Sequence, residues 1–363
     1  MSNNLAAFTP IKFSLKLVEV LYNDTIYTMI ANTKYEGEIK NAGDRVRVRT
    51  AATINLSVYT KQLTLVAQDL TPTSEDLIVD QQYYFKFVVD DIDKIQNDIE
   101  AINEYAQNAR SEMSQLLDRD LLSYARKNVK GANAVGTDYS TGTVAVAVTT
   151  GVVTGTGTTF TAGMVGGYFT ANAGVSYYLV TTYTSATSIT VTDLSGSGYT
   201  GGAVAGGTAF VLKAATPITL TKSNVYTYLV TLSTVMSQAL TPREDRFIVV
   251  NAAFEGILRQ APEFIPAVAD AYNNVIKNGQ IGRIANFNVI FSELVDGNNS
   301  TGYWFFAGTK EYMAFASQIM KVSVISSESD PNTFVSTCKG LLTWGRKVFE
   351  GNRGRGAVIR AII

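Results

Sequence analysis

The residue types on which catalytic sites most often depend are missing from this sequence. It has no histidine, which is the commonest general base and metal ligand, and its single cysteine, Cys338, can form neither a disulfide within the chain nor a thiolate metal cluster. Serine and threonine are abundant, but without histidine, or a Ser-x-x-Lys motif in its place, they lack a base to activate them. We therefore expect a protein that is not an enzyme and holds no metal or cofactor, and we expect Cys338 to be a buried apolar filler.

Carboxylates are the remaining groups that could carry chemistry. Asp90, Asp91 and Asp93 stand between a predicted strand and a predicted helix, where they could ligate a divalent cation. Capping of the free amides at the start of the helix is the simpler interpretation. Further along, Asp118 and Asp120 lie two positions apart and point in different directions on a helix, so we expect a solvated helix face rather than an acid–base pair.

Two groups of basic residues are candidates for contact with a partner. Arg45, Arg47 and Arg49 alternate with valines and therefore share one face of a predicted strand. The second group lies near the C-terminus and consists of Arg346, Lys347, Arg353, Arg355 and Arg360. Each group has two interpretations, either contact with nucleic acid or a neighbouring subunit's carboxylates, or a plain solvated surface. The net charge of -1 provides no general attraction for nucleic acid, so any such contact must be local.

The elements that must position these residues change in character along the chain. Residues 1–33 are typical of an arm, and residues 34–89 of a β ribbon. Apolar residues at three- and four-residue spacing, without Pro or Gly, predict a helix over 93–129. At 1.5 Å per residue this helix would be a rod of roughly 45 to 55 Å, which Gly131 ends. A second helix is predicted over 225–240, before Pro242.

Residues 139–215 differ in composition from both flanks. Thr, Gly, Val and Ala dominate there, and only Asp193 and Lys213 carry charge. Short β-rich runs between glycine clusters predict an inserted all-β sandwich or barrel. The glycine-rich run 154–160 lacks the Lys-Ser/Thr of a phosphate-binding loop and indicates a β turn. The ends of such an insertion lie close together, so we expect the chain before and after it to pack as one body.

Neither a secretory signal nor a membrane span is predicted. The first twenty residues lack a basic segment followed by an uninterrupted apolar run. Gly, Thr, Ser and Ala interrupt the long uncharged stretch too often for a span. We therefore expect a chain that stays in the reducing cytoplasm where it is made and has no membrane partner.

Two segments resemble the coat proteins of tailed bacteriophages. Residues 68–96 (QDLTPTSEDLIVDQQYYFKFVVDDIDKIQ) are similar to the ribbon-to-helix junction of that family, and residues 278–292 (NGQIGRIANFNVIFS) resemble a second coat-protein motif. Residues 242–258 and 305–316 flank the second motif in the family's order. The resemblance covers most of the chain outside 139–215, and that region is similar to the β domains that decorate phage structural proteins.

The resemblance implies an α+β fold of the Hong Kong 97 type with an inserted all-β domain. The implied parts are an N-terminal arm (1–33), an E-loop ribbon (34–89), a peripheral domain with a long spine helix (90–138), the inserted domain (139–215), an axial domain (216–331) and a return to the peripheral domain (332–363). Coat-like sequence begins by about Leu17, which implies that a scaffolding protein is a separate chain.

The function that the resemblance implies is that of a major capsid protein. Copies would assemble in the host cytoplasm into hexamers and pentamers of an icosahedral head, which becomes the virion and encloses double-stranded DNA. Further partners would be the scaffolding protein, a portal and decoration proteins. Arg45, Arg47, Arg49 and the aspartates at 90, 91 and 93 would lie at subunit interfaces, and the C-terminal basic group would meet DNA or a neighbouring subunit. A long ribbon and an arm cannot bury their apolar faces within one subunit, so neighbours would cover them.

An alternative function is recognition at the virion surface. In this interpretation, residues 139–215 contact carbohydrate or a host receptor. The region contains five tyrosines that could stack on sugars, although core packing is the simpler use for most of them. They are Tyr168, Tyr177, Tyr178, Tyr183 and Tyr199.

Overall fold

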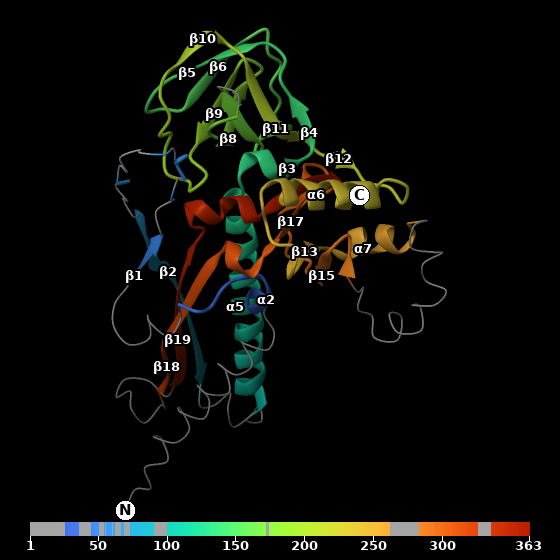
Figure 1. Ribbon diagram of the computed structural model, residues 1–363. Helices are drawn as coiled ribbons and strands as arrows, with labels where there is room; N and C mark the ends of the chain where they lie inside the picture. Colours follow the sequence, from blue (N-terminus) through green and yellow to red (C-terminus); the bar gives the residue numbers. More distant parts are fainter. Residues whose placement is uncertain are drawn as a thin grey trace, which may run out of the picture. The chain divides into compact units, whose positions relative to one another are not determined.

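The computed structural model describes residues 26–35, 45–50, 73–90, 100–171, 174–261, 283–325 and 335–363, with residues 54, 56–59, 61, 67 and 68 in addition. The chain divides into two compact units. Unit 1 contains the described residues of Asn32–Arg110 and Met313–Gly351, and unit 2 those of Asn23–Ala31, Ser111–Tyr312 and Asn352–Ile363. Figure 1 labels many of their elements.

Unit 1 is built on a four-stranded antiparallel sheet. Its strand order is β1 (Arg45–Thr50), β2 (Thr73–Asp90), β19 (Val335–Lys347) and β18 (Ala314–Ile325). The 18-residue strand β2 changes partner along its length, because Thr73 to Ile78 pair with β1 whereas Val79 to Asp90 pair with β19. The ribbon β1–β2 is therefore an extension of the central strand of this sheet.

The change of partner occurs at a glycine. The register of β19 against β2 shifts between Trp344 and Gly345, which is opposite Val79. A Cβ atom at Gly345 would collide with the backbone carbonyl of Ile78. Only glycine allows the two backbones to approach this closely.

The long helix α5 (Glu100–Lys127) runs through the boundary of the two units in sequence. It falls inside the predicted range 93–129, and its 28 residues span about 40 Å at 1.5 Å per residue. In the part whose side chains are described, Leu117, Leu121 and Ala125 are buried at the predicted four-residue spacing. Arg126 and Lys127 occupy the last turn, where cations favour the negative end of the helix dipole.

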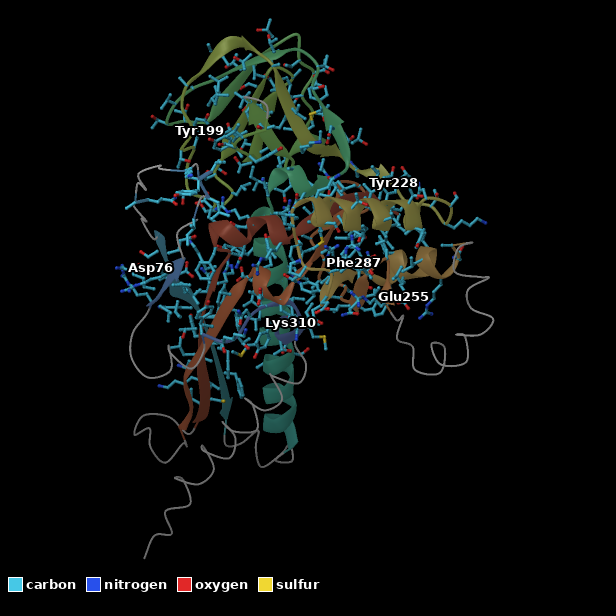
Figure 2. The ribbon with its side chains drawn as sticks, in the orientation of Figure 1. Asp76, Tyr199, Tyr228, Glu255, Phe287 and Lys310 are labelled. Carbon is cyan, nitrogen blue, oxygen red and sulfur yellow. The ribbon has the colours of Figure 1, made fainter. Side chains whose placement is uncertain are left out.

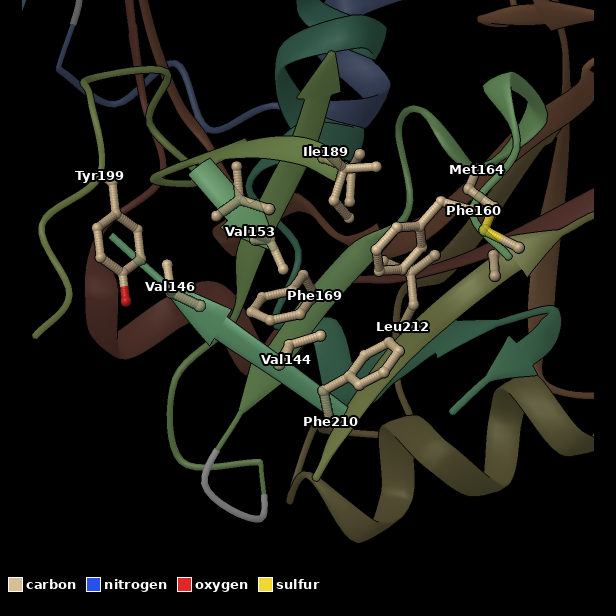
Figure 3. Packing of buried hydrophobic residues seen from close by; sticks show 13 residues of the cluster. Val144, Val146, Val153, Phe160, Met164, Phe169, Ile189, Tyr199, Phe210 and Leu212 are labelled. Atoms are coloured by element: carbon tan, nitrogen blue, oxygen red, sulfur yellow. The ribbon is translucent and has the colours of Figure 1, made fainter. Parts of the chain in front are cut away.

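Residues 137–216, here called the β module, form an eight-stranded antiparallel sheet. Buried side chains of the module form one cluster (Figure 3), in which the ring centroid of Phe210 lies 5.8 Å from those of Phe160 and Phe169. This core accounts for the short β-rich runs in the sequence, since each run contributes one or two inward residues. The strands in sheet order are β10 (Val204–Thr208), β5 (Thr143–Val146), β6 (Val152–Thr156), β9 (Ser188–Thr192), β8 (Tyr178–Ser185), β7 (Tyr168–Ala171), β11 (Phe210–Thr216) and β4 (Thr137–Tyr139).

The rest of unit 2 is a mixed sheet with helices α6 (Val225–Gln238) and α7 (Ala252–Arg259). Every residue of its central strand β13 is buried, as expected of a strand covered on both faces. Helix α6 matches the predicted helix before Pro242 to within two residues. The strand order is β12 (Ile218–Thr219), β20 (Ala357–Ile362), β17 (Gly302–Thr309), β13 (Arg246–Val250), β15 (Phe287–Phe291) and β14 (Arg283–Ile284), with β3 (Ala134–Val135) on β20 and β16 (Gly297–Asn298) on β17.

The chain enters and leaves the β module beside one strand. β3, just before the module, pairs with Val358 and Ile359 of β20, and β12, just after it, pairs with Ala361 and Ile362 of the same strand. The short strands on either side of the module therefore join one sheet. Residues 332–363 divide between the units, because β19 lies in unit 1 and β20 lies in unit 2.

Five short helical segments complete the described chain. They are α2 (Tyr27–Ile30), η2 (Gly131–Asn133), η3 (Ala162–Met164), η5 (Lys310–Tyr312) and η7 (Glu350–Arg355). Among the described residues, no helix is apolar over a stretch long enough to cross a lipid bilayer.

Candidate subunit interface

The three arginines of β1 lie on one exposed face of the ribbon, as their alternation with valine predicts. Asp76 of β2 lies directly opposite Arg47 (Figure 2). Arg47 Nε donates to Asp76 Oδ1 at 2.8 Å and Nη2 donates to Oδ2 at 3.2 Å, while Arg45 Nη1 lies 3.9 Å from Oδ2. The hydrogen-bonded guanidinium holds the pKa of the Asp76 carboxyl below its usual value. Arg49 is exposed and forms no ion pair with any residue that the structure describes.

The opposite face of the ribbon base is covered within the same chain. Leu77 is fully buried against Ala314, Ala316 and Phe349, and the valines of β1 pack on the same cluster. The expectation that the ribbon cannot bury its apolar face within one subunit is therefore wrong for the ribbon base. Ala314 and Ala316 of β18, together with Phe349, supply the cover.

Four apolar residues that the structure describes between β1 and β2 are exposed. Ile54, Leu56 and Val58 alternate with polar residues and are 68%, 97% and 84% exposed, and Tyr59 is 67% exposed. We call these four residues the apolar strip. Single exposed apolar side chains are ordinary, but four within six positions form a patch of the kind that marks a contact site.

The acidic junction is described only in part. The backbone of Asp90 ends β2 opposite Val335. Asp91 and Asp93 lie outside the described residues, so both interpretations of the junction remain predictions. In the described part of the chain, no three Cys, Asp or Glu side chains gather where they could hold a metal ion.

The five C-terminal basic residues belong to two different units. Arg346 and Lys347 are in unit 1, where Lys347 Nζ lies 3.6 Å from Glu75 Oε2. Arg353, Arg355 and Arg360 are in unit 2. Arg355 forms an ion pair with Glu311, and Arg353 is half-buried.

Arg360 lies in the interior of unit 2. It is 1% exposed, and all three of its guanidinium nitrogens donate to backbone carbonyls. The acceptors are Thr301 O (3.1 Å from Nε and 2.8 Å from Nη2), Ala214 O and Ala215 O (3.1 and 2.7 Å from Nη1) and Gly163 O (2.6 Å from Nη2). Burial, with the nearby charge of Arg126, lowers its pKa to about 10. The expected basic surface therefore does not include Arg360.

Arg360 shares Trp304 with a second buried arginine. The guanidinium carbons of Arg126 and Arg360 lie 4.5 and 4.8 Å from the centroid of the Trp304 ring. Arg126 also donates to Asp296 Oδ2 at 2.8 Å and to Gly166 O at 3.3 Å. Three of the four carbonyls that hold Arg360, and Gly166, belong to the β module. The pair of arginines on Trp304 thus fixes the module to the mixed sheet, by cation–π contacts and carbonyl hydrogen bonds.

Tyrosines of the β module serve packing rather than an open surface. Tyr168 is fully buried, donates to Arg126 O and has a pKa raised by burial, and its ring meets Trp304 edge-on at 6.1 Å. Tyr199 is buried and packs on Tyr178 at 4.7 Å. None of the five tyrosines is fully exposed. This packing gives no support to a stacking platform for sugars.

Asp118 is buried, contrary to the expected solvated helix face. It is 5% exposed, and its Oδ2 accepts a hydrogen bond of 3.2 Å from the amide of Ile26. No sequence signal links these residues, since the partner lies 92 positions away.

Comparison with known proteins gives similarity only at the level of structure. No family model and no curated protein matches the sequence. A solved chain from Mycobacterium phage Che8 is 17% identical, with a TM-score of 0.57 over 93% of this chain and 91% of that one. A chain of the capsid of Cyanophage P-SCSP1u is 9% identical, with a TM-score of 0.51 over 92% and 85%. A chain of the mature capsid of bacteriophage PhiM1 is 10% identical, with a TM-score of 0.51 over 92% and 88%.

These likenesses extend over nearly the whole chain and over most of each solved chain. At such low identity they define the fold and not the details of function. The chain has the mixed α and β fold of phage capsid proteins. The resemblance to phage coat proteins drawn from the sequence is confirmed.

Proposed function

We propose that the protein is the major capsid protein of a tailed phage, with a fold of the Hong Kong 97 type. Copies assemble into hexamers and pentamers of an icosahedral head that encloses double-stranded DNA. The observation that carries this proposal is the likeness to phage capsid chains over more than nine-tenths of the sequence. Such a protein acts by assembly and is not an enzyme.

Each part of the chain takes a role in this proposal. The ribbon β1–β2 is the E-loop, α5 is the spine helix, the sheet of unit 1 is the peripheral domain, and the mixed sheet is the axial domain. β20 lies in the mixed sheet beside β17, β12 and β3. The β module is the inserted domain.

The apolar strip supports an assembled state. Its four residues are 67% to 97% exposed in a single copy, at an unfavourable free energy of about 25 cal/mol for each Å² of apolar surface left in water. A neighbouring copy that covered the strip would recover that free energy. Many such weak contacts, repeated around a closed shell, give a stable particle.

Charged residues would complete the contacts between copies. Arg45, Arg47 and Arg49 form the exposed face of the ribbon, and Asp90, Asp91 and Asp93 are the proposed acidic counterpart. Of the C-terminal group, Arg346, Lys347, Arg353 and Arg355 remain candidates for DNA or a neighbouring subunit. Scaffolding protein, portal and decoration proteins are the further proposed partners, and the virion is the proposed location.

Substitution in the apolar strip tests this function. Leu56→Lys places a charge where a neighbour would cover an apolar side chain, so the variant is expected to fold normally and to form few or no shells. Val175→Lys, at an 83% exposed position of the β module, is the matched control and should assemble like the parent protein. Circular dichroism checks folding, and sedimentation with electron microscopy counts particles. Normal shells from Leu56→Lys would show that assembly does not depend on the apolar strip.

A further inference from the structure

The short segment of residues 26–31 is attached to α5 at a single acidic side chain. Within it, the helix α2 contains Tyr27 and Ile30, both buried. Ile26, at the N-cap position, has no side-chain oxygen to cap the helix itself. The cap is supplied from α5, where Asp118 accepts from the amide of Ile26 at 3.2 Å and also interacts with the amide of Tyr27.

Only one of the two carboxylate oxygens of Asp118 accepts a hydrogen bond from a described residue. Oδ1 of Asp118 is buried and has no hydrogen-bond partner among the described residues. One turn earlier on α5, the hydroxyl of Ser114 is buried in the same condition. A buried ionised carboxylate with an unbonded oxygen is costly, whereas the protonated form is neutral and can donate a hydrogen bond.

Among the residues that the structure describes, no neighbouring charge offsets this cost. The ionisable residues nearest in sequence on α5 are Glu112, Arg119 and Asp120, and α2 contributes Tyr27. Neither these groups nor a charged group of any other described element contributes to the electrostatics of Asp118. Burial raises the pKa of Asp118 to about 6, and the amides of Ile26 and Tyr27 oppose that rise only in part.

We propose that residues 26–31 form a strap whose hold on α5 is set by the protonation of Asp118, firm when the carboxyl is protonated and loosened when it ionises. Between Ala31 and Asn32 the chain passes from unit 2 into unit 1. Release of the strap would detach residues 26–31 from α5 without unfolding the sheets of unit 2. This inference does not depend on the capsid proposal, because it concerns a single chain.

The direction of the pH dependence follows from linkage. Asp118 binds its proton more tightly while the strap is docked. After release, Asp118 returns to water and to its usual pKa. Docking is therefore strongest below that usual value and weakens as the pH rises towards 6. The difference of about two pKa units corresponds to a change of about a hundredfold in the docking equilibrium.

Hydrogen exchange of the full chain tests the strap. Protection of the amides of residues 26–31, corrected for the intrinsic effect of pH on exchange, is measured by mass spectrometry between about pH 4 and 7.5. In the parent protein, we expect protection to fall by up to about a hundredfold as the pH rises. Asp118→Asn keeps an acceptor oxygen without the charge, so its protection should stay high and nearly independent of pH. Glu112→Gln, an exposed change on the same helix, should behave like the parent protein.

Two results would overturn the proposal. One is an equal pH dependence in Asp118→Asn and in the parent protein. The other is parental protection that stays constant or rises with pH, which decides the matter even if Asp118→Asn fails to fold.

Discussion

Arg360 and Trp304 meet in the interior of unit 2, where the guanidinium carbon lies 4.8 Å from the centroid of the indole ring. No carboxylate contributes to the electrostatics of Arg360. Its charge is balanced instead by carbonyl dipoles of Thr301 and of the β module. Because these acceptors come from segments far apart in sequence, one side chain joins the C-terminal strand to the module.

Loss of this arginine should destabilise the protein strongly. Arg360→Met leaves several buried carbonyls without donors, so we expect the free energy of unfolding to fall by about 3 kcal/mol or more. Arg355→Met is the matched control, since it removes the same charge from a more exposed ion pair with Glu311 and should cost less than about 1 kcal/mol. Urea unfolding followed by fluorescence compares them, and an equal loss in both variants would contradict the anchoring role.

The glycine at the partner change of β2 should not tolerate a side chain. In Gly345→Ala, the new Cβ would collide with a backbone carbonyl, so we expect a loss of about 2 kcal/mol or more in unfolding free energy. Gly256→Ala in α7 offers the contrast, because nothing lies near its Cβ and alanine favours helix, which should stabilise by up to about 1 kcal/mol. Thermal unfolding measures both changes. A harmless Gly345→Ala would show that the strands do not approach as closely as described.

The single thiol should be unreactive in the folded protein. Cys338 is buried in β19, and burial raises the pKa of its thiol to about 11. At pH 8 the thiolate is then about one part in a thousand, so disulfide reagents should react far more slowly than with the chain in urea. Rapid labelling without denaturant would mean that β19 opens readily or is exposed.

The ion pair on the ribbon should matter little for folding. Arg47 and Asp76 are joined on the ribbon surface, where water and salt screen their attraction. We expect Arg47→Ala and Asp76→Ala to leave the unfolding free energy nearly unchanged. Assembly should respond differently from folding. If the arginine face contacts a neighbouring copy, as proposed, Arg47→Ala should slow assembly and alter the salt dependence of its rate. Light scattering at several salt concentrations gives the assembly rate. A large loss of folding stability would show that the pair has a structural role.

The elements that could be predicted from the sequence are those set by local pattern. The alternation in β1 and the three- and four-residue spacing in α5 depend only on near neighbours, and both are present in the structure. Arg360 could not be assigned in this way, because its acceptors lie 59 to 197 positions away and a basic residue near a chain end is usually solvated. The burial of Asp118 could not be predicted for the same reason, because its partner Ile26 lies 92 positions away.

The residues that cover the ribbon base also could not be predicted from local sequence pattern. Leu77 and the valines of β1 alternate as a one-sided ribbon should, and nothing near them in sequence shows what lies against them. Ala314 and Phe349, more than two hundred positions away, provide the cover. Composition, in contrast, was sufficient to mark residues 139–215 as a β region, because the change from the flanks is abrupt at both ends.

Electron microscopy of the purified full-length protein, with sedimentation of the same sample, tests the capsid proposal most directly. The account predicts hexameric and pentameric rings, or closed shells, once the protein is concentrated, alone or with its scaffolding protein. A protein that stays a monomer at high concentration under both conditions, with the apolar strip still in solvent, would contradict it.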